Sequence, residues 1–466
     1  MHRTLLLVLA VAVACAAVAF GEPFATVDFT QRTGKVNPML HGSGWAPRSY
    51  PRGLVKDEEL LAPLRLKAFR THDAPLVNSG QQIVDTHCIF PLMHLDAKDP
   101  KNYVFKPTDH WLQLGRDMGM KVMYRLGSSI EHTGDWGYNT LNPTNHEQYA
   151  EVLAGIVRHY TKGWADGFTW DIRYWELFNE PEVPACWRGT KEEMIHLYVT
   201  CLKRLKSEFP ELKIGGPAFG CYNEPYVRAV LEACKKEGVR PDFIAWHYYG
   251  QNIQELAWHP NGMHKVCASC GFGDVELVID EWHYLVSWDG LQAASSPDMV
   301  ERATEGVLGI KNIDSAVFTI SVLARFQDTR LDQSYFYGSG FDGSWGYVNK
   351  CRRPAKVYYA MKMNGDLCND FTDKVKSTYD EKGNRTAFGA WSADGKKACL
   401  IVADFRGLGQ VLEVVVKGLE GAKHVSCVVL DNDRDLLDSP YELRNGVLRL
   451  VKAERRSAAY MLTFEF

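Results

Sequence analysis

Two glutamates that end apolar segments are the residues of this sequence best suited to joint acid and base chemistry. Residues 174–180 (YWELFNE) form an apolar stretch that ends at Glu180. Residues 277–281 (LVIDE) repeat this pattern and end at Glu281. A carboxylate at the mouth of a buried strand lies in a low dielectric, which raises its pKa towards neutrality. Cleavage of a glycosidic bond requires such a pair, one carboxylate as the acid and one as the nucleophile or base.

Eight apolar segments between residues 37 and 370 alternate with amphipathic helical patterns, and they would position this pair. The predicted strands are residues 39–45, 68–73, 121–126, 172–179, 213–219, 243–248, 276–281 and 316–324. Strands that alternate with helices form a parallel sheet, and eight of them indicate an α/β fold of the (β/α)₈ TIM barrel type. Glu180 would end the fourth strand and Glu281 the seventh, at the end of the barrel where all strands meet a common mouth. A lone glutamate at a strand end is more often solvated or ion-paired, so the hypothesis depends on the pair.

The chain changes character beyond the predicted barrel, which covers residues 37–370. Residues 398–405, 411–419, 425–430, 447–451 and 459–466 have the pattern of β-strands, separated by short turn sequences. We therefore predict that residues 371–466 form an all-β sandwich as an accessory domain. One or more strands from residues 22–36 are expected to complete it, because residues 25–30 alternate in polarity just before the barrel begins.

The N-terminal residues 1–21 have the pattern of a secretory signal peptide, because Arg3 precedes an apolar run that continues to Ala19. A lipoprotein signal through Cys15 is the weaker alternative, since apolar residues continue beyond that cysteine. The predicted location is therefore secreted or periplasmic. No later segment approaches the ~20 apolar residues that a membrane span needs. The net charge of -4 offers no basic surface for nucleic acid.

The chain contains 12 cysteines, and their spacing does not suggest a disulfide framework. Cys267 and Cys270 could form a tight local disulfide or half of a zinc site. The zinc interpretation needs a second pair of ligands at a suitable spacing, and none follows in the sequence. We therefore predict no metal site, and the chemistry expected of two carboxylates needs no metal or organic cofactor.

Four short motifs, in this order, resemble those of a known enzyme family. They are residues 69–73 (FRTHD), 175–181 (WELFNEP), 247–249 (HYY) and 280–282 (DEW). The chain resembles the retaining (β/α)₈ glycoside hydrolases of the 4/7 superfamily, clan A. Within that clan it is most similar to glycoside hydrolase family 39, the family of β-xylosidases and α-L-iduronidases. The resemblance implies that Glu180 is the general acid/base and Glu281 the nucleophile.

The resemblance also implies roles for residues beside this pair. Asn179 would form a hydrogen bond with the sugar 2-hydroxyl, and His247 would bind the sugar. The hydroxyl of Tyr249 would donate a hydrogen bond to Glu281, with Tyr248 as the alternative donor. Strict strand alternation would place Asn179 and Glu180 on opposite faces, so both can serve one site only if the strand twists or bulges there.

Two residues at the end of the second predicted strand complete the predicted binding set. Arg70 and His72 are expected to position the nucleophile and to hold a sugar hydroxyl, although a purely structural ion pair of Arg70 is an equal alternative. Glu176, one layer below Glu180, needs a cation such as Arg70 or Arg125 if it is buried. Arg125 and Arg325 are also the candidate cations near the mouth for a uronic acid.

Tryptophans are the candidate stacking walls for a sugar ring, because an indole is flat and apolar. Trp282, beside Glu281, is the tryptophan assigned to substrate binding. The full set of candidates is Trp45, Trp136, Trp246, Trp282 and Trp345.

The sequence thus predicts a secreted retaining glycoside hydrolase that acts on an oligosaccharide or polysaccharide by double displacement. One alternative is an endo-glycanase or an arabinofuranosidase of a sister family in the same clan. Another is a carbohydrate-binding barrel without catalytic activity. The identity of the sugar, its anomeric configuration and the choice of exo or endo cleavage depend on loops and stay open.

Overall fold

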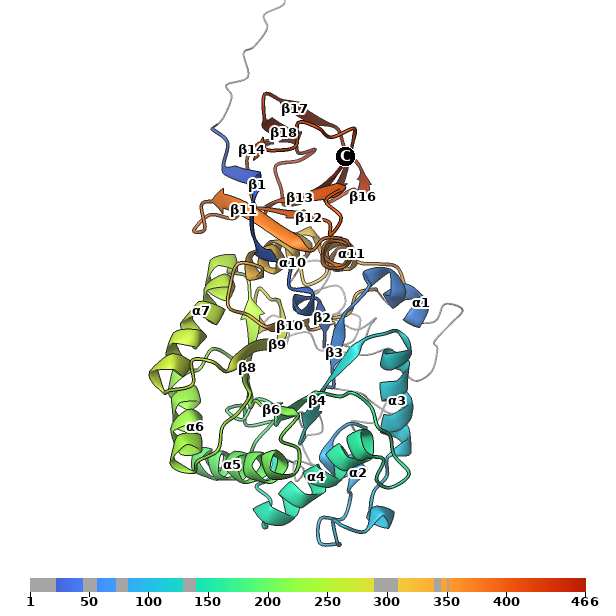
Figure 1. Cartoon of the computed structure of the whole chain (residues 1–466), viewed down its shortest axis with the longest axis vertical. Coiled ribbons are helices and arrows are strands. Elements are labelled where there is room, and N and C mark those ends of the chain that lie inside the picture. Colours follow the sequence, from blue (N-terminus) through green and yellow to red (C-terminus); the bar gives the residue numbers. More distant parts are fainter. Residues whose placement is uncertain are drawn as a thin grey trace, which may run out of the picture.

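The chain folds into a barrel of parallel strands inside a ring of helices, and a β-rich unit packs against one side of that ring (Figure 1). This computed structural model describes residues 22–44, 57–72, 83–128, 140–288, 309–338, 345–349 and 352–466. The predicted signal peptide, and with it Cys15, lies outside the described residues.

The parallel sheet has nine strands in the order β6-β5-β4-β3-β2-β10-β9-β8-β7. They are β2 (Gly42–Ser43), β3 (Ala68–Arg70), β4 (Lys121–Leu126), β5 (Tyr174–Leu177), β6 (Lys213–Gly215), β7 (Ala218–Phe219), β8 (Phe243–Gly250), β9 (Glu276–Tyr284) and β10 (Gln333–Phe336). Strands β6 and β7 are two parts of one predicted strand, and the Gly216 amide donates to Phe243 O of β8 at 3.2 Å. Nine strands therefore fill eight barrel positions, which confirms the predicted fold class. Strand β5 is the fourth position and β9 the seventh.

Helices follow most of these strands and form the outer ring (Figure 1). Helix α5 begins with the capping box that Thr190 and Glu193 form, and helix α4 ends at Gly163 with a left-handed backbone (φ 72°). The α-helices are α1 (Asp57–Leu61), α2 (Thr86–Ile89), α3 (Lys106–Asp117), α4 (His146–Lys162), α5 (Lys191–Glu208), α6 (Glu224–Lys236), α7 (Ile253–Ser269), α10 (Ile313–Phe326) and α11 (Lys356–Asp370). Single 3-10 turns are η1 (Pro38–Leu40), η2 (Ala62–Leu64) and η3 (Pro100–Asn102).

The predicted eighth strand, residues 316–324, is wrong, because these residues lie within helix α10. The true eighth strand is β10, which follows that helix. Helix α10 packs against β9 on one side and against β12, β13 and β19 of the second sheet on the other. A helix buried on all sides needs no polar stripe, so its sequence shows no helical period.

The second sheet has ten strands, in the order β16-β15-β19-β13-β12-β11-β1-β14-β18-β17. They are β1 (Ala25–Lys35), β11 (Asp373–Tyr379), β12 (Arg385–Trp391), β13 (Lys397–Asp404), β14 (Val411–Lys417), β15 (His424–Leu430), β16 (Asp435–Asp438), β17 (Tyr441–Arg444), β18 (Val447–Val451) and β19 (Ala458–Glu465). Strand β1 pairs antiparallel with β11 and parallel with β14. Side chains from both halves of the sheet, such as Val27, Leu400 and Leu450, share one apolar core.

One face of the second sheet packs against the barrel. On β13, Ile401 belongs to the large core of the barrel, whereas its neighbour Leu400 belongs to the core of the sheet. At the end of α10, Arg325 donates to the carbonyl oxygens of Glu381 and Gly383 at 2.8 Å. Arg325 is therefore an interface residue, and its predicted place near the barrel mouth is wrong.

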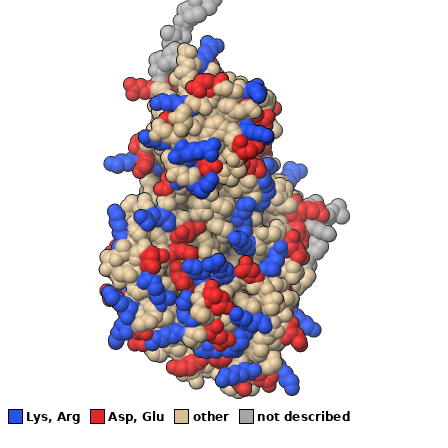
Figure 2. Space-filling model, viewed as in Figure 1, with Lys and Arg blue, Asp and Glu red and all other residues tan. Residues whose placement is uncertain are grey.

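The surface charge, the helices and the cysteines of the described residues bear on the remaining predictions. Basic and acidic side chains are interspersed over the face that Figure 2 shows. Among the described residues, no helix combines the length and the apolar character needed to cross a bilayer. Cys267 and Cys270 are both buried free thiols, so the disulfide alternative is wrong.

Candidate active site

The strand end that carries Glu180 departs from regular β geometry. Phe178 (φ 70°) and Glu180 (φ 44°) both have left-handed backbones, and Asn179 between them bridges to Ala218 of β7. The Glu180 amide donates to the carbonyl oxygen of Ala218 at 2.6 Å, which holds the distorted end against the next strand. Because regular alternation is broken, Asn179 and Glu180 both reach the same cluster of polar side chains.

A β-bulge does the same for the strand end that carries Glu281. In the pairing of β8 with β9, Trp246 lies opposite Ile279 but His247 lies opposite Glu281. Asp280 is therefore the extra residue of the bulge. It lies fully buried on the same side as Glu281, whereas a regular strand would have turned it away.

The two predicted catalytic carboxylates face each other across the mouth. One oxygen of Glu180, one oxygen of Glu281 and a ring nitrogen of His247 all lie within 4.8 Å of one another. Carboxyl groups ~5 Å apart leave no room for a water between them and a sugar, which is the spacing of enzymes that form a covalent intermediate.

Three donors converge on Glu281. The hydroxyl of Tyr249 donates to Oε1 at 2.5 Å, while Arg70 Nη1 and His72 Nε2 each lie 3.2 Å from Oε2. Burial raises the pKa of Glu281 to about 7, against the opposing effects of the His247 charge and the Tyr249 hydrogen bond. The carboxylate of Glu281 is thus held in one orientation and titrates near neutral pH.

The guanidinium of Arg70 contacts residues at the ends of both β5 and β9. It is fully buried, and its Nε lies 2.6 Å from Glu176 Oε2 and 3.0 Å from Asp280 Oδ2. Its Nη2 donates to Asn179 Oδ1 at 2.8 Å. Arg70 is therefore the cation that Glu176 requires, and the same guanidinium also contacts Glu281. Burial nevertheless raises the pKa of Glu176 to about 8.

Glu180 has a different set of donors. His247 Nδ1 lies 2.8 Å from its Oε1, and the Cys186 thiol donates to its Oε2 at 3.5 Å. Burial raises the pKa of Glu180, but the hydrogen bond and charge of His247 outweigh it, so the pKa lies below its usual value. The expectation of a raised pKa therefore fails for Glu180 in this arrangement and holds for Glu281.

His247 lies between two acids. Its Nε2 is 3.2 Å from Asp280 Oδ2, and Nδ1 faces Glu180. Burial lowers the pKa of His247, but the charges of Glu281 and Asp280 raise it well above its usual value. Because the ring is fully buried and both nitrogens face carboxylates, His247 positions Glu180 in this structure and does not present a free nitrogen to a sugar.

Three of the predicted substrate contacts are corrected by burial. Trp282 is fully buried, its indole donates to Ser334 Oγ at 2.8 Å, and it packs against Phe326 and Phe336. Trp282 faces the helices, so the prediction that it stacks on a sugar is wrong. Trp246 is equally buried, so the same prediction is also wrong for Trp246. Arg125 is fully buried and its Nη2 lies 2.6 Å from Asp85 Oδ1, so its guanidinium is not available to a uronic acid.

Aromatic rings beside Tyr249 form a wall that the sequence analysis identified only in part. The ring of Tyr249 meets Trp288 and Trp345 edge to face, with centroids 5.0 Å and 5.2 Å apart. Trp288 is 47% exposed, so its indole face is available to a ligand. Trp345 was one of the tryptophans predicted to stack on a sugar. Trp288 and Cys186 were not predicted, because each lies several residues beyond the end of a strand and no sequence pattern places it near the site. The remaining candidates, Trp45 and Trp136, lie outside the described residues.

Comparison with known proteins gives matches in sequence over part of the chain. Residues 67–269 match the family model for glycosyl hydrolases family 39. A β-xylosidase of Caldicellulosiruptor saccharolyticus is 30% identical over 151 residues, which are 31% of this chain and 30% of that protein. A β-xylosidase of Geobacillus stearothermophilus is 26% identical over 127 residues, 27% of this chain and 25% of that protein. The chain thus matches less than a third of the length of these relatives.

Similar solved structures cover nearly the whole chain. A glucosidase from Croceicoccus marinus has a TM-score of 0.74 at 18% identity and covers 95% of this chain and 99% of its own. An α-L-arabinofuranosidase from Thermotoga maritima has a TM-score of 0.65 at 14% identity and covers 95% and 100%. These likenesses establish the shared fold of barrel and β-unit. The match to the family model covers residues 67–269, which include the strands that carry Arg70, Glu180 and His247.

Proposed function

We propose that this protein is a retaining glycoside hydrolase with Glu281 as nucleophile and Glu180 as general acid/base. The observation that carries the proposal is the pair of facing carboxylates, with oxygens within 4.8 Å, at the ends of the fourth and seventh barrel strands. Nearest oxygens this close support the ~5 Å separation of carboxyl groups that retaining enzymes use.

Glu281 attacks the anomeric carbon of the bound sugar, and a covalent glycosyl ester forms as the glycosidic bond breaks. Glu180 gives its proton to the departing oxygen. In the second step the ionised Glu180 takes a proton from water, which attacks the same carbon and releases Glu281. The hydroxyl of Tyr249 and the guanidinium of Arg70 orient the attacking carboxylate and favour its ionised form.

The attacking state needs the proton on Glu180 and the charge on Glu281. Both acids lie within one cluster, and moving one proton between them leaves the net charge of the site unchanged. Nδ1 of His247 lies 2.8 Å from Glu180 Oε1, so a protonated His247 can pass its Nδ1 proton to the acid before bond cleavage. Asp280 on the other ring nitrogen keeps the imidazole oriented throughout.

Asn179 is assigned to the sugar 2-hydroxyl. Its Oδ1 accepts from Arg70, which leaves the Nδ2 amide as the group able to donate to a hydroxyl. A hydrogen bond to this hydroxyl strengthens in the transition state. Trp288 and Trp345, beside Tyr249, supply the apolar surface for the ring of the same sugar.

The proposed substrates are oligosaccharides or polysaccharides, and the proposed location is secreted or periplasmic. Because the partially matching relatives are named β-xylosidases, aryl β-xylosides are the first compounds to test, with aryl α-L-arabinofuranosides as the second set. The N-terminal sequence of the protein recovered from its host tests cleavage of the predicted signal.

Covalent labelling tests the mechanism directly. An activated 2-fluoro glycoside should inactivate the enzyme, and peptide mass mapping should place the label on Glu281. Azide should restore turnover to Glu281→Ala and give a glycosyl azide of inverted configuration, while Glu180→Ala with azide should give the retained one. A label on any other residue would overturn the assignment, and sugar binding without turnover of any glycoside would favour the silent binding protein.

A further inference from the structure

The three groups at the centre of the site also have the composition of a metal site. Among the described residues, Glu180, His247 and Glu281 are the one group of three or more acidic, histidine or cysteine side chains that could hold an ion. His247 Nδ1 lies 2.8 Å from Glu180 Oε1 and 3.7 Å from Glu281 Oε1. Ligands of Zn²⁺ at ~2.0–2.2 Å from the metal lie roughly 3 to 3.5 Å apart, so shifts of under ~1 Å would enclose an ion.

Asp280 supplies the second, independent indication. Histidines that bind metals almost always donate their other ring N–H to a carboxylate, which fixes the tautomer and aims the free nitrogen at the ion. Asp280 Oδ2 lies 3.2 Å from His247 Nε2, on the far side of the ring from Glu180 and Glu281. A proton held at Nε2 leaves the Nδ1 lone pair directed between the two carboxylates.

The charge of the cluster favours a cation. Four buried or nearly buried carboxylates, those of Glu176, Glu180, Asp280 and Glu281, face the single guanidinium of Arg70 and the rings of His247 and His72. An ion that replaces the Nδ1 proton of His247 adds positive charge where acids are in excess.

We propose that Glu180, His247 and Glu281 bind one Zn²⁺-class ion, and that this ion and the glycoside exclude each other. Imidazole nitrogen with two carboxylates suits Zn²⁺, whereas Mg²⁺ and Ca²⁺ prefer all-oxygen coordination and gain little from an imidazole ligand. Metal binding does not depend on the proposed function. Its effect on turnover does, because the ion would occupy the oxygens that attack the sugar and protonate the leaving group.

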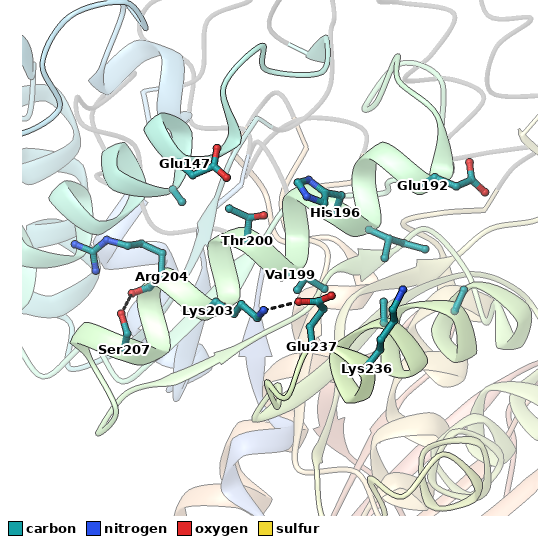
Figure 3. Close-up of a pocket in the computed structure, with 14 residues that line it drawn as sticks. Glu147, Glu192, His196, Val199, Thr200, Lys203, Arg204, Ser207, Lys236 and Glu237 are labelled. Carbon is teal, nitrogen blue, oxygen red and sulfur yellow. Dashed lines mark hydrogen bonds and ion pairs between the residues drawn. The ribbon is translucent and has the colours of Figure 1, made fainter.

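A pair of surface histidines provides a matched control. His146 of α4 and His196 of α5 bring their Nδ1 atoms to 2.7 Å in the outer ring of helices, and neither residue belongs to the catalytic cluster. His196 borders a cavity of about 740 Å³ between α4, α5 and α6, together with Glu147 and Thr200 (Figure 3). This pair is the alternative place for zinc, and His196→Asn removes it without touching the catalytic cluster.

Isothermal titration of the purified full chain with ZnCl₂ tests the proposal, with MgCl₂ as a parallel titrant. Wild type and His196→Asn should each bind one ion that EDTA removes, and Glu281→Gln should lose about tenfold or more in affinity. Thermal unfolding of Glu281→Gln without metal checks that the variant is folded. Unchanged zinc affinity in Glu281→Gln, loss of binding in His196→Asn, or equal binding of Mg²⁺ would overturn the proposal.

Kinetics separate this proposal from the proposed function. Zinc should raise the apparent KM of wild type and of His196→Asn without changing kcat, and EDTA should reverse the effect. It should also slow labelling by the 2-fluoro glycoside. Zinc that binds while no label forms would retain the metal site and reject the glycosidase, whereas labelling without zinc binding would do the opposite.

Discussion

The strand ends that carry Glu180 and Glu281 both depart from regular β geometry, but they do so in different ways. Strand β5 ends in left-handed residues, and β9 carries a bulge at Asp280, so each presents two consecutive polar side chains to one site. Their glutamates then differ in surroundings. Glu281 is held by three donors on a nearly inaccessible side chain, whereas the side chain of Glu180 is 18% exposed and is held by His247 and a thiol. A firmly held carboxylate suits attack on carbon, and a more accessible one suits proton exchange with a leaving group and water.

The largest effect is expected at the firmly held carboxylate. Glu281→Gln keeps the shape of the side chain but removes the nucleophile, so kcat/KM should fall by about 10⁵-fold for every substrate. Steady-state rates on aryl glycosides of differing leaving-group pKa measure this. A loss confined to poor leaving groups would mean that the two glutamates have been assigned in the wrong order.

Glu180→Gln should show a loss that depends on the leaving group. General acid catalysis contributes about 10²- to 10⁴-fold, and an activated leaving group such as dinitrophenolate needs no proton. For that substrate the first step should survive, and the covalent intermediate should accumulate and give a burst of product. A plot of log kcat/KM against leaving-group pKa should be much steeper than for wild type, and equal slopes would contradict the role of Glu180.

Removal of the cation that joins the two strand ends should destabilise the fold. Arg70→Met leaves Glu176 buried without its cation and Asp280 with His247 as its remaining partner, which should lower the free energy of unfolding by about 3 to 5 kcal/mol. Urea unfolding measures it. Lys203→Met breaks the exposed ion pair with Glu237 (Figure 3) and should change the stability little. Similar losses of stability in Arg70→Met and Lys203→Met would show that the buried ion pairs of Arg70 stabilise the fold no more than an exposed ion pair does.

Tyr249→Phe should shift the pH profile. The hydrogen bond from Tyr249 lowers the pKa of Glu281, which is about 7, so its loss should raise that pKa. Because the attacking carboxylate must be ionised, the acidic limb of kcat/KM should move to higher pH, by about one pH unit. An acidic limb that stays in place would show that another group controls it.

The smallest effect is expected at the thiol beside Glu180. Cys186→Ala removes the donor to Oε2 and should lower kcat/KM by about two- to fivefold, since one neutral hydrogen bond is involved. Cys186→Ser keeps a donor and should recover most of the loss. If both variants lose activity equally, Cys186 contributes only packing.

Sequence patterns were sufficient for features that depend on local order. The apolar run before Glu180 and the strand at residues 121–126 were both predicted with the correct type of structure. Where packing on two sides removed the periodic signal, as in α10, the prediction failed. Alternation also gave no means of placing Asp280 beside Glu281, because a bulge is a property of strand pairing and not of one strand.

The sequence by itself determined that two carboxylates end the fourth and seventh strands of a parallel barrel, because hydrophobic period and strand order are written along the chain. Only the tertiary structure decided which charges meet. Arg70 contacts residues of both strand ends. His247, predicted to bind the sugar, is the partner of Glu180 and Asp280. Trp282, predicted to stack on the sugar, lies in the core. Contacts between residues far apart in sequence depend on distances of an ångström, and these are set by how strands pair and bulge once the barrel closes.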